Sequence, residues 1–153
     1  MRSETARESV TVEVDTSTVE MLAHGSITGV VFIRCGSATF PSRGWTDFPV
    51  VIFEWWLEPV LRILQGKTRQ WECRFMDGPC LARLIQEQDD TWSLTGLHHD
   101  RAEFQVLVSC AQFLRSVLRA ASTLLAECEK NGWQTRDIDH LASTVRSLQT
   151  PLQ

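Results

Sequence analysis

The chain has 153 residues, of which 43% are hydrophobic and 22% charged, and this composition predicts one soluble globular domain over residues 1–153. Its net charge of −4 argues against a nucleic-acid ligand, because binding phosphates requires clustered lysine and arginine. No apolar run reaches the roughly 18 residues of a membrane span, and the polar N-terminus does not resemble a secretory signal. We therefore expect a cytoplasmic protein that binds neither nucleic acid nor membrane.

The N-terminal part of the chain predicts two neighbouring strands. Residues 1–8 are polar and are expected to be frayed. Residues 9–15 alternate valine with polar residues, which predicts a half-buried strand. Residues 27–35 form a nearly continuous apolar run rich in β-branched residues, which is typical of a more central strand.

The stretch 45–66 carries three of the six tryptophans and predicts the central helix of the fold. Asp47 is expected to cap its N-terminus, and the apolar positions that follow, Trp55 among them, recur at helical spacing. Pro59 cannot donate a backbone hydrogen bond, so we expect it to kink or split the helix.

The next part of the chain predicts a three-stranded meander. Residues 69–76, 80–87 and 91–98 each fit a strand, and tight turns containing Asp-Gly-Pro and Gln-Asp-Asp separate them. These turns are too short for anything but antiparallel neighbours.

Two helices are expected after the meander. Asp100, with Glu103 three positions on, resembles a capping box for a long helix over residues 103–131, and a second amphipathic helix follows over 135–148. The predicted order is ββ-α-βββ-α-α. This is an α+β fold with an antiparallel sheet of about five strands and helices packed on one face.

The sequence offers no catalytic or metal-binding constellation. The five cysteines are odd in number and widely spaced, so we interpret them as buried thiols in a reducing compartment. His98 and His99 are adjacent at a strand end and should point to opposite faces, so neither zinc nor another metal is expected. Glu54 and Glu58 lie one helical turn apart. This spacing fits a pair of carboxylates oriented together, and it fits the solvated edge of a helix equally well. We predict a protein that is not an enzyme and uses no cofactor.

Two surfaces have a composition suited to binding a protein partner. The first is the loop with Phe40, Arg43 and Trp45, which suits an interface hot spot, although an aromatic staple at the helix entry explains Trp45 as well.

The second surface is acidic. It comprises the turn with Glu87, Asp89 and Asp90, and we expect Asp100 and Glu103 to lie nearby. Such a patch steers a basic partner during encounter, whereas the alternative is a solvated hairpin tip.

Three motifs carry a family resemblance: GWxDF at residues 44–48, EWWL at 54–57 and FMDGP at 75–79. Together with the element order over residues 9–148, they resemble the small single-domain immunity proteins that accompany polymorphic and contact-dependent bacterial toxins. The resemblance implies a cytoplasmic protein that neutralises a cognate toxin by direct binding and without a cofactor, and it assigns no functional residue. The acidic net charge of the chain suggests that this toxin is basic. A structural or regulatory homodimer and a binder of a small ligand in a tryptophan-lined pocket stay open as alternatives.

Overall fold

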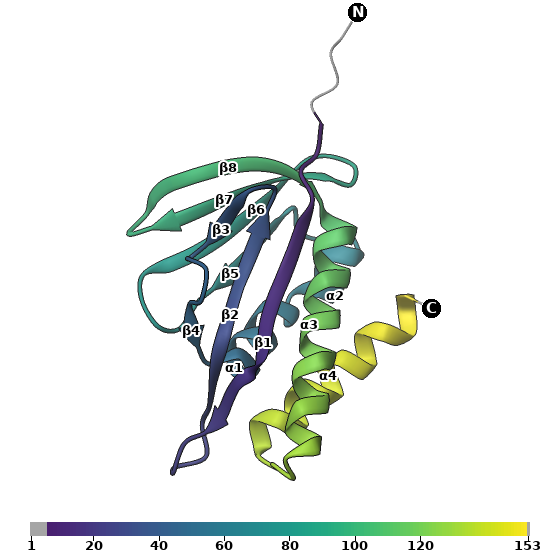
Figure 1. Cartoon of the computed structure of the whole chain (residues 1–153). Coiled ribbons are helices and arrows are strands. Elements are labelled where there is room, and N and C mark those ends of the chain that lie inside the picture. Colours follow the sequence, from purple (N-terminus) through teal and green to yellow (C-terminus); the bar gives the residue numbers. More distant parts are fainter. Residues whose placement is uncertain (1–5, 153) are drawn as a thin grey trace, which may run out of the picture.

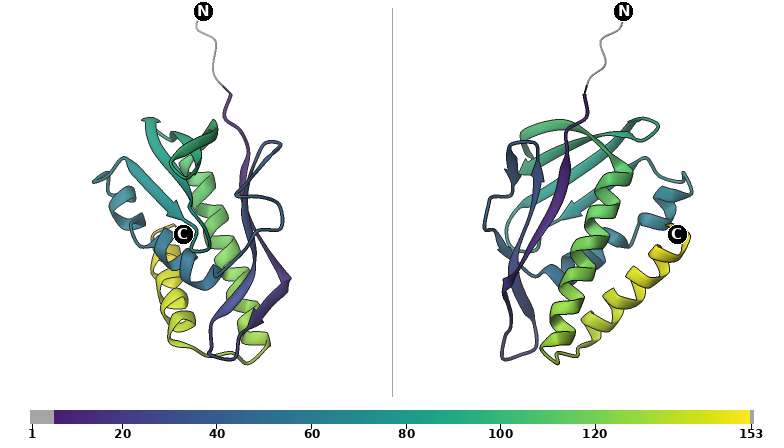
Figure 2. Two further views of the ribbon diagram at one scale, coloured as in Figure 1. Left: turned by 90° about the vertical axis from the view of Figure 1, so that its left-hand side faces the viewer. Right: turned by 45° about the vertical axis from the view of Figure 1, so that its right-hand side comes forward.

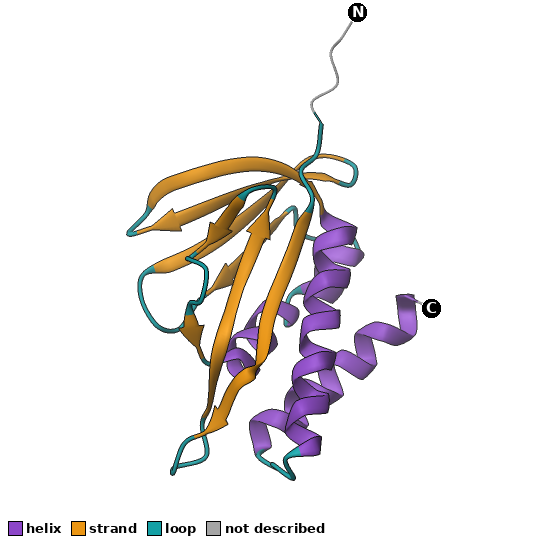
Figure 3. Cartoon of the chain, viewed as in Figure 1, coloured by secondary structure: helices purple, strands orange, loops and turns teal. Residues whose placement is uncertain are grey.

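Two antiparallel sheets and a group of helices make up the fold, and the computed structural model describes it for residues 6–152, with side-chain surroundings as far as residue 149 (Figure 1; Figure 3). The first sheet has the strands β1 (Val10–Met21), β2 (Ile27–Cys35), β3 (Ala38–Phe40) and β4 (Thr46–Asp47), of which β1, β3 and β4 all pair with β2. The second sheet has the strands β5 (Gln70–Arg74), β6 (Cys80–Gln88), β7 (Thr91–His98) and β8 (Arg101–Ser109), in that order. The helices are α1 (Pro49–Leu57), α2 (Val60–Leu64), α3 (Cys110–Lys130) and α4 (Arg136–Leu152).

The predicted α+β class and the antiparallel meander are confirmed, but the sheet prediction was incomplete. The described residues form eight strands in two sheets, where the sequence predicted about five strands in one. Strand β1 also runs to Met21, beyond the predicted end at residue 15, with an irregularity in its pairing between Asp15 and Glu20.

The largest error concerns residues 101–109, which form strand β8 and not the first turns of a helix. This segment also fits a strand, because the β-branched residues Val106 and Val108 stand two positions apart and so lie on one face of a strand. Asp100 therefore caps no helix; it lies in a tight turn at φ 63°. The long helix begins at Cys110, where the Ser109 hydroxyl accepts the backbone N–H of Gln112.

The two sheets share one core. The ring of Phe40 on β3 lies 5.7 Å from the ring of Phe104 on β8, and both press on Gly96 of β7. A Cβ at Gly96 would lie 2.4 Å from the Phe104 ring, so only glycine allows this approach. Before β1, the backbone N–H of Glu8 donates to the Leu107 carbonyl of β8. The expected fraying of residues 1–5 lies outside the described residues, whereas residues 7 and 8 are attached.

The helices cover the edge of the first sheet and the ends of both sheets (Figure 2). Helix α3 runs along β1, where the buried Ser116 hydroxyl accepts the Val12 backbone N–H at 2.7 Å. This bond satisfies a donor on the outer edge of β1, which has no strand partner on that side among the described residues. Helix α1 contacts β2, β5, α3 and α4 and is therefore central, as expected.

Asp47 anchors the chain where it enters α1. Its carboxylate is 1% exposed and accepts four donors, which are the indole N–H of Trp45 and the backbone N–H groups of Phe48, Met76 and Asp77. The N-cap position belongs to Phe48, so the expected capping role of Asp47 was wrong. Pro59 separates α1 from α2, as predicted.

Trp56, and not Trp55, carries the core contacts of α1. Its indole N–H donates to the Arg74 carbonyl at 2.7 Å, and its own carbonyl accepts the indole N–H of Trp71 at 2.7 Å. These two bonds fasten α1 to β5. Trp55, which we counted among the apolar positions of the predicted helix, is 45% exposed and lies on the solvent side of α1.

We predict that Trp56→Ala lowers the free energy of unfolding by about 3–5 kcal/mol, because it opens a cavity and removes the bond to Arg74. Urea denaturation followed by circular dichroism measures the change. Trp55→Ala, one position away on the exposed side, is the matched control and should change stability by less than about 1 kcal/mol. Equal losses in the two variants would contradict this assignment.

Candidate functional site

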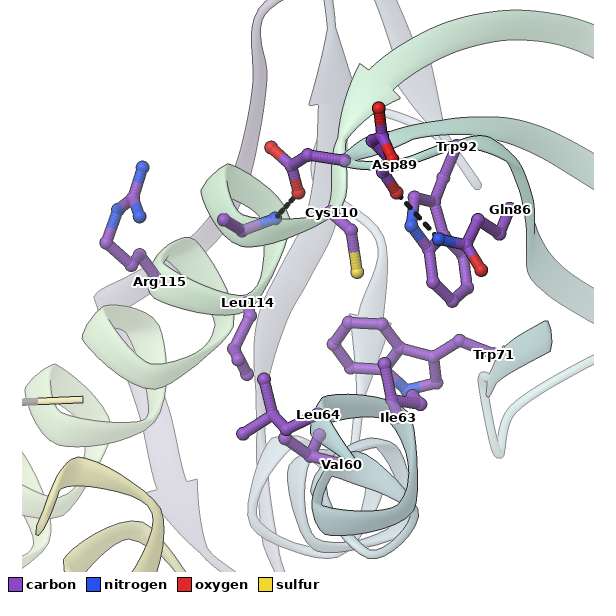
Figure 4. Close-up of a pocket in the computed structure, with 12 residues that line it drawn as sticks. Val60, Ile63, Leu64, Trp71, Gln86, Asp89, Trp92, Cys110, Leu114 and Arg115 are labelled. Carbon is purple, nitrogen blue, oxygen red and sulfur yellow. Dashed lines mark hydrogen bonds between the residues drawn. The ribbon is translucent and has the colours of Figure 1, made fainter. Parts of the chain in front are cut away.

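A cavity of about 290 Å³ lies between α2, the start of α3 and the second sheet, and we call it the α2 pocket (Figure 4). Its apolar walls come from four elements, α2, β5, β7 and α3: Val60, Ile63, Leu64, Trp71, Trp92, Cys110, Ala111 and Leu114. Its polar rim consists of Gln86, Asp89, Asp90 and Arg115.

The walls of the α2 pocket are held rigidly. Trp71 is fixed by its bond to the Trp56 carbonyl and packs edge-on against Phe113 at 5.0 Å between ring centroids. Val60 and Leu114 are buried. Because these side chains also belong to the main core, the cavity is part of the folded framework.

The outer rim of the α2 pocket is apolar as well. Leu61 and Leu64 are 47% and 46% exposed, and their spacing of three places them on one side of α2. Leu64 is one of the apolar positions at helical spacing in the predicted helix, whereas nothing in the sequence pattern singles out Leu61. The available signal was that four of the five α2 residues are apolar, which is more than one buried face requires.

The acidic turn between β6 and β7 lies on the rim of this pocket, but Asp90 is structurally committed. Its carboxylate accepts the backbone N–H of Ala111 at 2.9 Å and the Ser109 hydroxyl, and it pairs with Arg7 at 3.3 Å. Asp90 thus caps helix α3 from a neighbouring turn and ties the N-terminal segment to it.

Asp89 and Glu87 are exposed, and neither side chain forms a recorded hydrogen bond or ion pair within the described residues. Asp89 adopts φ 48°, and its carbonyl accepts the side-chain N–H of Gln86 at 2.8 Å, which holds the turn in shape. Its carboxylate is therefore free to meet a ligand.

Asp100 and Glu103 do not join this acidic turn, contrary to expectation. They lie at the opposite end of β7, which has eight residues and so spans roughly 23 Å at about 3.3 Å per residue. Glu103 instead lies 3.7 Å from Nδ1 of His98, both being exposed.

The loop of Phe40, Arg43 and Trp45 does not present two aromatic anchors. Phe40 is 1% exposed and belongs to the core, so it cannot contact a partner. Trp45 is half-buried with its N–H on Asp47, and its ring contacts Gly78 of the following turn. This matches the structural alternative of an aromatic staple at the helix entry. Only Arg43 is exposed, beside a shallow hollow on the outer face of β1 and β2.

Glu54 and Glu58 do not form a carboxylate pair. Oε1 of Glu54 accepts the Thr144 hydroxyl of α4 at 2.8 Å and lies 3.6 Å from Nε2 of His140, and Oε2 is buried without a partner. Glu58 instead forms an exposed ion pair with Arg62 on α2 at 3.2 Å.

The histidine cluster forms a turn. His99 and Asp100 have φ values of 53° and 63°, and the rings of His98 and His99 lie 4.8 Å apart, tilted to each other. Within residues 6–149, no three histidine, cysteine or acidic side chains converge as metal ligands would.

The cysteines are poorly suited to nucleophilic chemistry. All five are free and buried. Burial, reinforced by Asp90, raises the pKa of the Cys110 thiol in the α2 pocket to about 12. Burial also raises the pKa of Cys35 to about 12 and that of Cys128 to about 11, and it raises those of Cys73 and Cys80. The thiolate is the reactive form, so these groups are inert near neutral pH.

Comparison of the chain with protein-family models, with curated proteins and with solved structures found no match. No helix in the described part of the chain is both long enough and apolar enough to cross a membrane.

We predict that Asp90→Ala lowers the free energy of unfolding by about 1–2 kcal/mol, because α3 loses a cap that two donors share. Chemical denaturation measures the change. Asp89→Gly is the matched control: glycine accepts the positive φ, and no recorded side-chain bond is lost, so stability should change by less than about 0.5 kcal/mol. A loss at Asp89 equal to that at Asp90 would contradict the cap.

Stability should fall in alkaline solution. A thiol whose pKa is raised in the folded state releases its proton more readily when unfolded, so its stabilising contribution is complete below about pH 8.5 and is lost as pH rises through the folded pKa of about 11–12. The chain has no tyrosine to obscure this titration. Denaturation midpoints should therefore decline above pH 9, and less steeply in Cys110→Ala. A flat profile up to pH 11 would contradict thiol burial.

Proposed function

We propose that the protein is a non-enzymatic protein-binding module that neutralises a cognate bacterial toxin by direct binding in the cytoplasm. The observation that carries this proposal is the exposure of Leu61 and Leu64 beside the apolar α2 pocket. Exposed apolar side chains next to a rigid pocket are typical of the energetic centre of a protein interface. The family resemblance of the sequence supports a toxin as the partner.

Charge supports a basic partner. The free carboxylate of Asp89 borders the pocket, Glu87 lies two residues before it, and the whole chain carries −4. Acidic groups around an apolar centre raise the rate of encounter with a basic protein and set its orientation, while the apolar centre supplies the affinity.

The chemistry of the site supports binding rather than catalysis. The thiol of Cys110 has its pKa raised by burial, and Asp90 is occupied as a helix cap. The remaining polar groups of the rim contain no nucleophile with an adjacent base. The five free thiols support the cytoplasm as the compartment.

A second candidate function is the binding of a small molecule, and the α2 pocket itself favours it. A volume of about 290 Å³ lies at the lower end of the range for ligand sites and suits a molecule the size of one amino acid. The two candidates differ in the role of Leu61, which lies outside the cavity lining and would contact a protein but not a small ligand.

We predict that the double variant Leu61→Asp/Leu64→Asp binds the partner at least tenfold more weakly, because two charges replace the apolar rim. The assay co-expresses the chain with the product of the gene immediately upstream, where a toxin gene is expected, and measures affinity by calorimetry and rescue of growth. Met76→Asp is the matched control, since Met76 is also exposed (38%) but lies in the turn after β5. Unchanged affinity in the double variant would overturn the proposed surface.

The same assay separates steering from anchoring. Reversal of Glu87 and Asp89 to lysine should slow association at low salt and leave the dissociation rate nearly unchanged. Asp90 is kept, because its reversal would remove the cap of α3. An unchanged association rate would show that the acidic turn is only a solvated hairpin tip. Self-association of the free chain that the double leucine variant abolishes would instead identify a homodimer.

A further inference from the structure

The α2 pocket contains an unused hydrogen-bond donor. The indole N–H groups of Trp45, Trp56 and Trp71 each donate to an oxygen atom of the chain. Trp92 is only 4% exposed, yet its N–H forms no hydrogen bond within the described residues. Its nitrogen is still reachable from solvent, and therefore by a ligand. An indole nitrogen can only donate, so a ligand atom that meets it must be an acceptor.

An unused acceptor lies beside this donor. Figure 4 shows the nitrogen-bearing edge of Trp92 turned toward Asp89, whose carboxylate has no recorded partner in the described chain. Asp90 is fully engaged by Ala111, Ser109 and Arg7. The guanidinium of Arg115 is turned away from the cavity (Figure 4). Apart from the Gln86 amide, which is held by its bond to the Asp89 carbonyl, the mouth of the pocket therefore offers the Trp92 N–H as a donor and the Asp89 carboxylate as an acceptor above an apolar interior.

This pattern discriminates among ligand head groups. A carboxylate would satisfy Trp92 but would be repelled by Asp89 and Asp90. An ammonium group would satisfy Asp89 but would leave the Trp92 N–H without an acceptor, which is costly once water is excluded. A carbonyl joined to an N–H, which is an amide, satisfies both groups at once. The aliphatic and aromatic walls suit an apolar body of side-chain size.

We propose that the α2 pocket binds an apolar residue of the partner protein, with the side chain in the cavity and a backbone amide held between the Trp92 N–H and the Asp89 carboxylate. This inference rests on the proposed protein-binding function and names the anchor that the same surface takes. Leucine, methionine and phenylalanine have the required size and lack a charge that would have to be buried.

The test uses the purified full chain without any partner. N-acetyl-leucine amide is titrated while the indole N–H signals are followed by NMR, and those of Trp71 and Trp92 should shift saturably with a dissociation constant of about 1 mM, as expected of a fragment this small. N-acetyl-glycine amide has the same head without the body, and isoamylamine and isovalerate have similar bodies with charged heads. Each should bind at least fivefold more weakly.

Three variants locate the binding. Trp92→Phe keeps the ring but removes the donor, and Asp89→Gly removes the acceptor while tolerating the positive φ of the turn. Both variants should bind N-acetyl-leucine amide at least fivefold more weakly. Because Trp92→Phe lacks the Trp92 signal, its binding is followed through the indole N–H signal of Trp71. Ala111→Phe, which fills the cavity, should abolish binding, and Trp55→Phe should leave it unchanged. If Trp92→Phe disturbs the fold, the affinity of the surface variant Asp89→Gly still tests whether the amide binds at the mouth of the pocket.

Several outcomes would overturn the inference. They are the absence of a saturable shift, equal binding of the glycine and leucine amides, tighter binding of a charged head, and retained affinity in Asp89→Gly or Ala111→Phe. Failure of the proposed function looks different. Leucine amide would then bind as predicted while no partner protein depends on Leu61 and Leu64, and the pocket would be a site for a free small amide. Conversely, a partner that depends on Leu61 and Leu64 but leaves the Trp92 signal unchanged overturns only the anchor.

Discussion

The buried carboxylate of Asp47 is the constraint on which the rest of the structure depends. A charge that is 1% exposed is tolerable only with full hydrogen bonding, and the four donors come from two separate segments of the chain. The motif GWxDF at residues 44–48 supplies the acid and two donors, and FMDGP at 75–79 supplies the other two. Two motifs that look independent in the sequence are therefore the two halves of one junction.

This junction sets the geometry of the candidate site. It fixes the start of α1 against the end of β5. The bonds from Trp56 to the Arg74 carbonyl and from Trp71 to the Trp56 carbonyl continue the attachment along the helix. Pro59 then ends α1, so that the short α2 lines the pocket together with Trp71 and Trp92 of the second sheet and leaves two leucines exposed. On the other side of the pocket, Asp90 fixes the β6–β7 turn to the start of α3. The pocket therefore lies between two rigid attachments, and little reorganisation is needed for binding.

Much of the fold follows from sequence periodicity, but most of the site does not. Strands β2, β6 and β7 and the break at Pro59 are readable because apolar spacing and turn residues agree there. Residues 101–109 include five apolar residues among nine, at positions that fit either period, so their pairing with β7 decides that they form a strand. Asp89 was recognised as a candidate and borders the pocket. Leu61 and the free N–H of Trp92 were not foreseeable, because exposure and hydrogen-bond partners depend on tertiary contacts.

The central claim is that the face formed by α2 and the β6–β7 turn contacts a protein partner. The most direct measurement is hydrogen–deuterium exchange of the chain alone and in complex with the product of the upstream gene. We expect slower exchange on binding in residues 60–66 and 86–92, with little change at residues 98–103 or in the loop 41–44. Protection confined to those latter segments, with unchanged exchange in α2 and the β6–β7 turn, would contradict it.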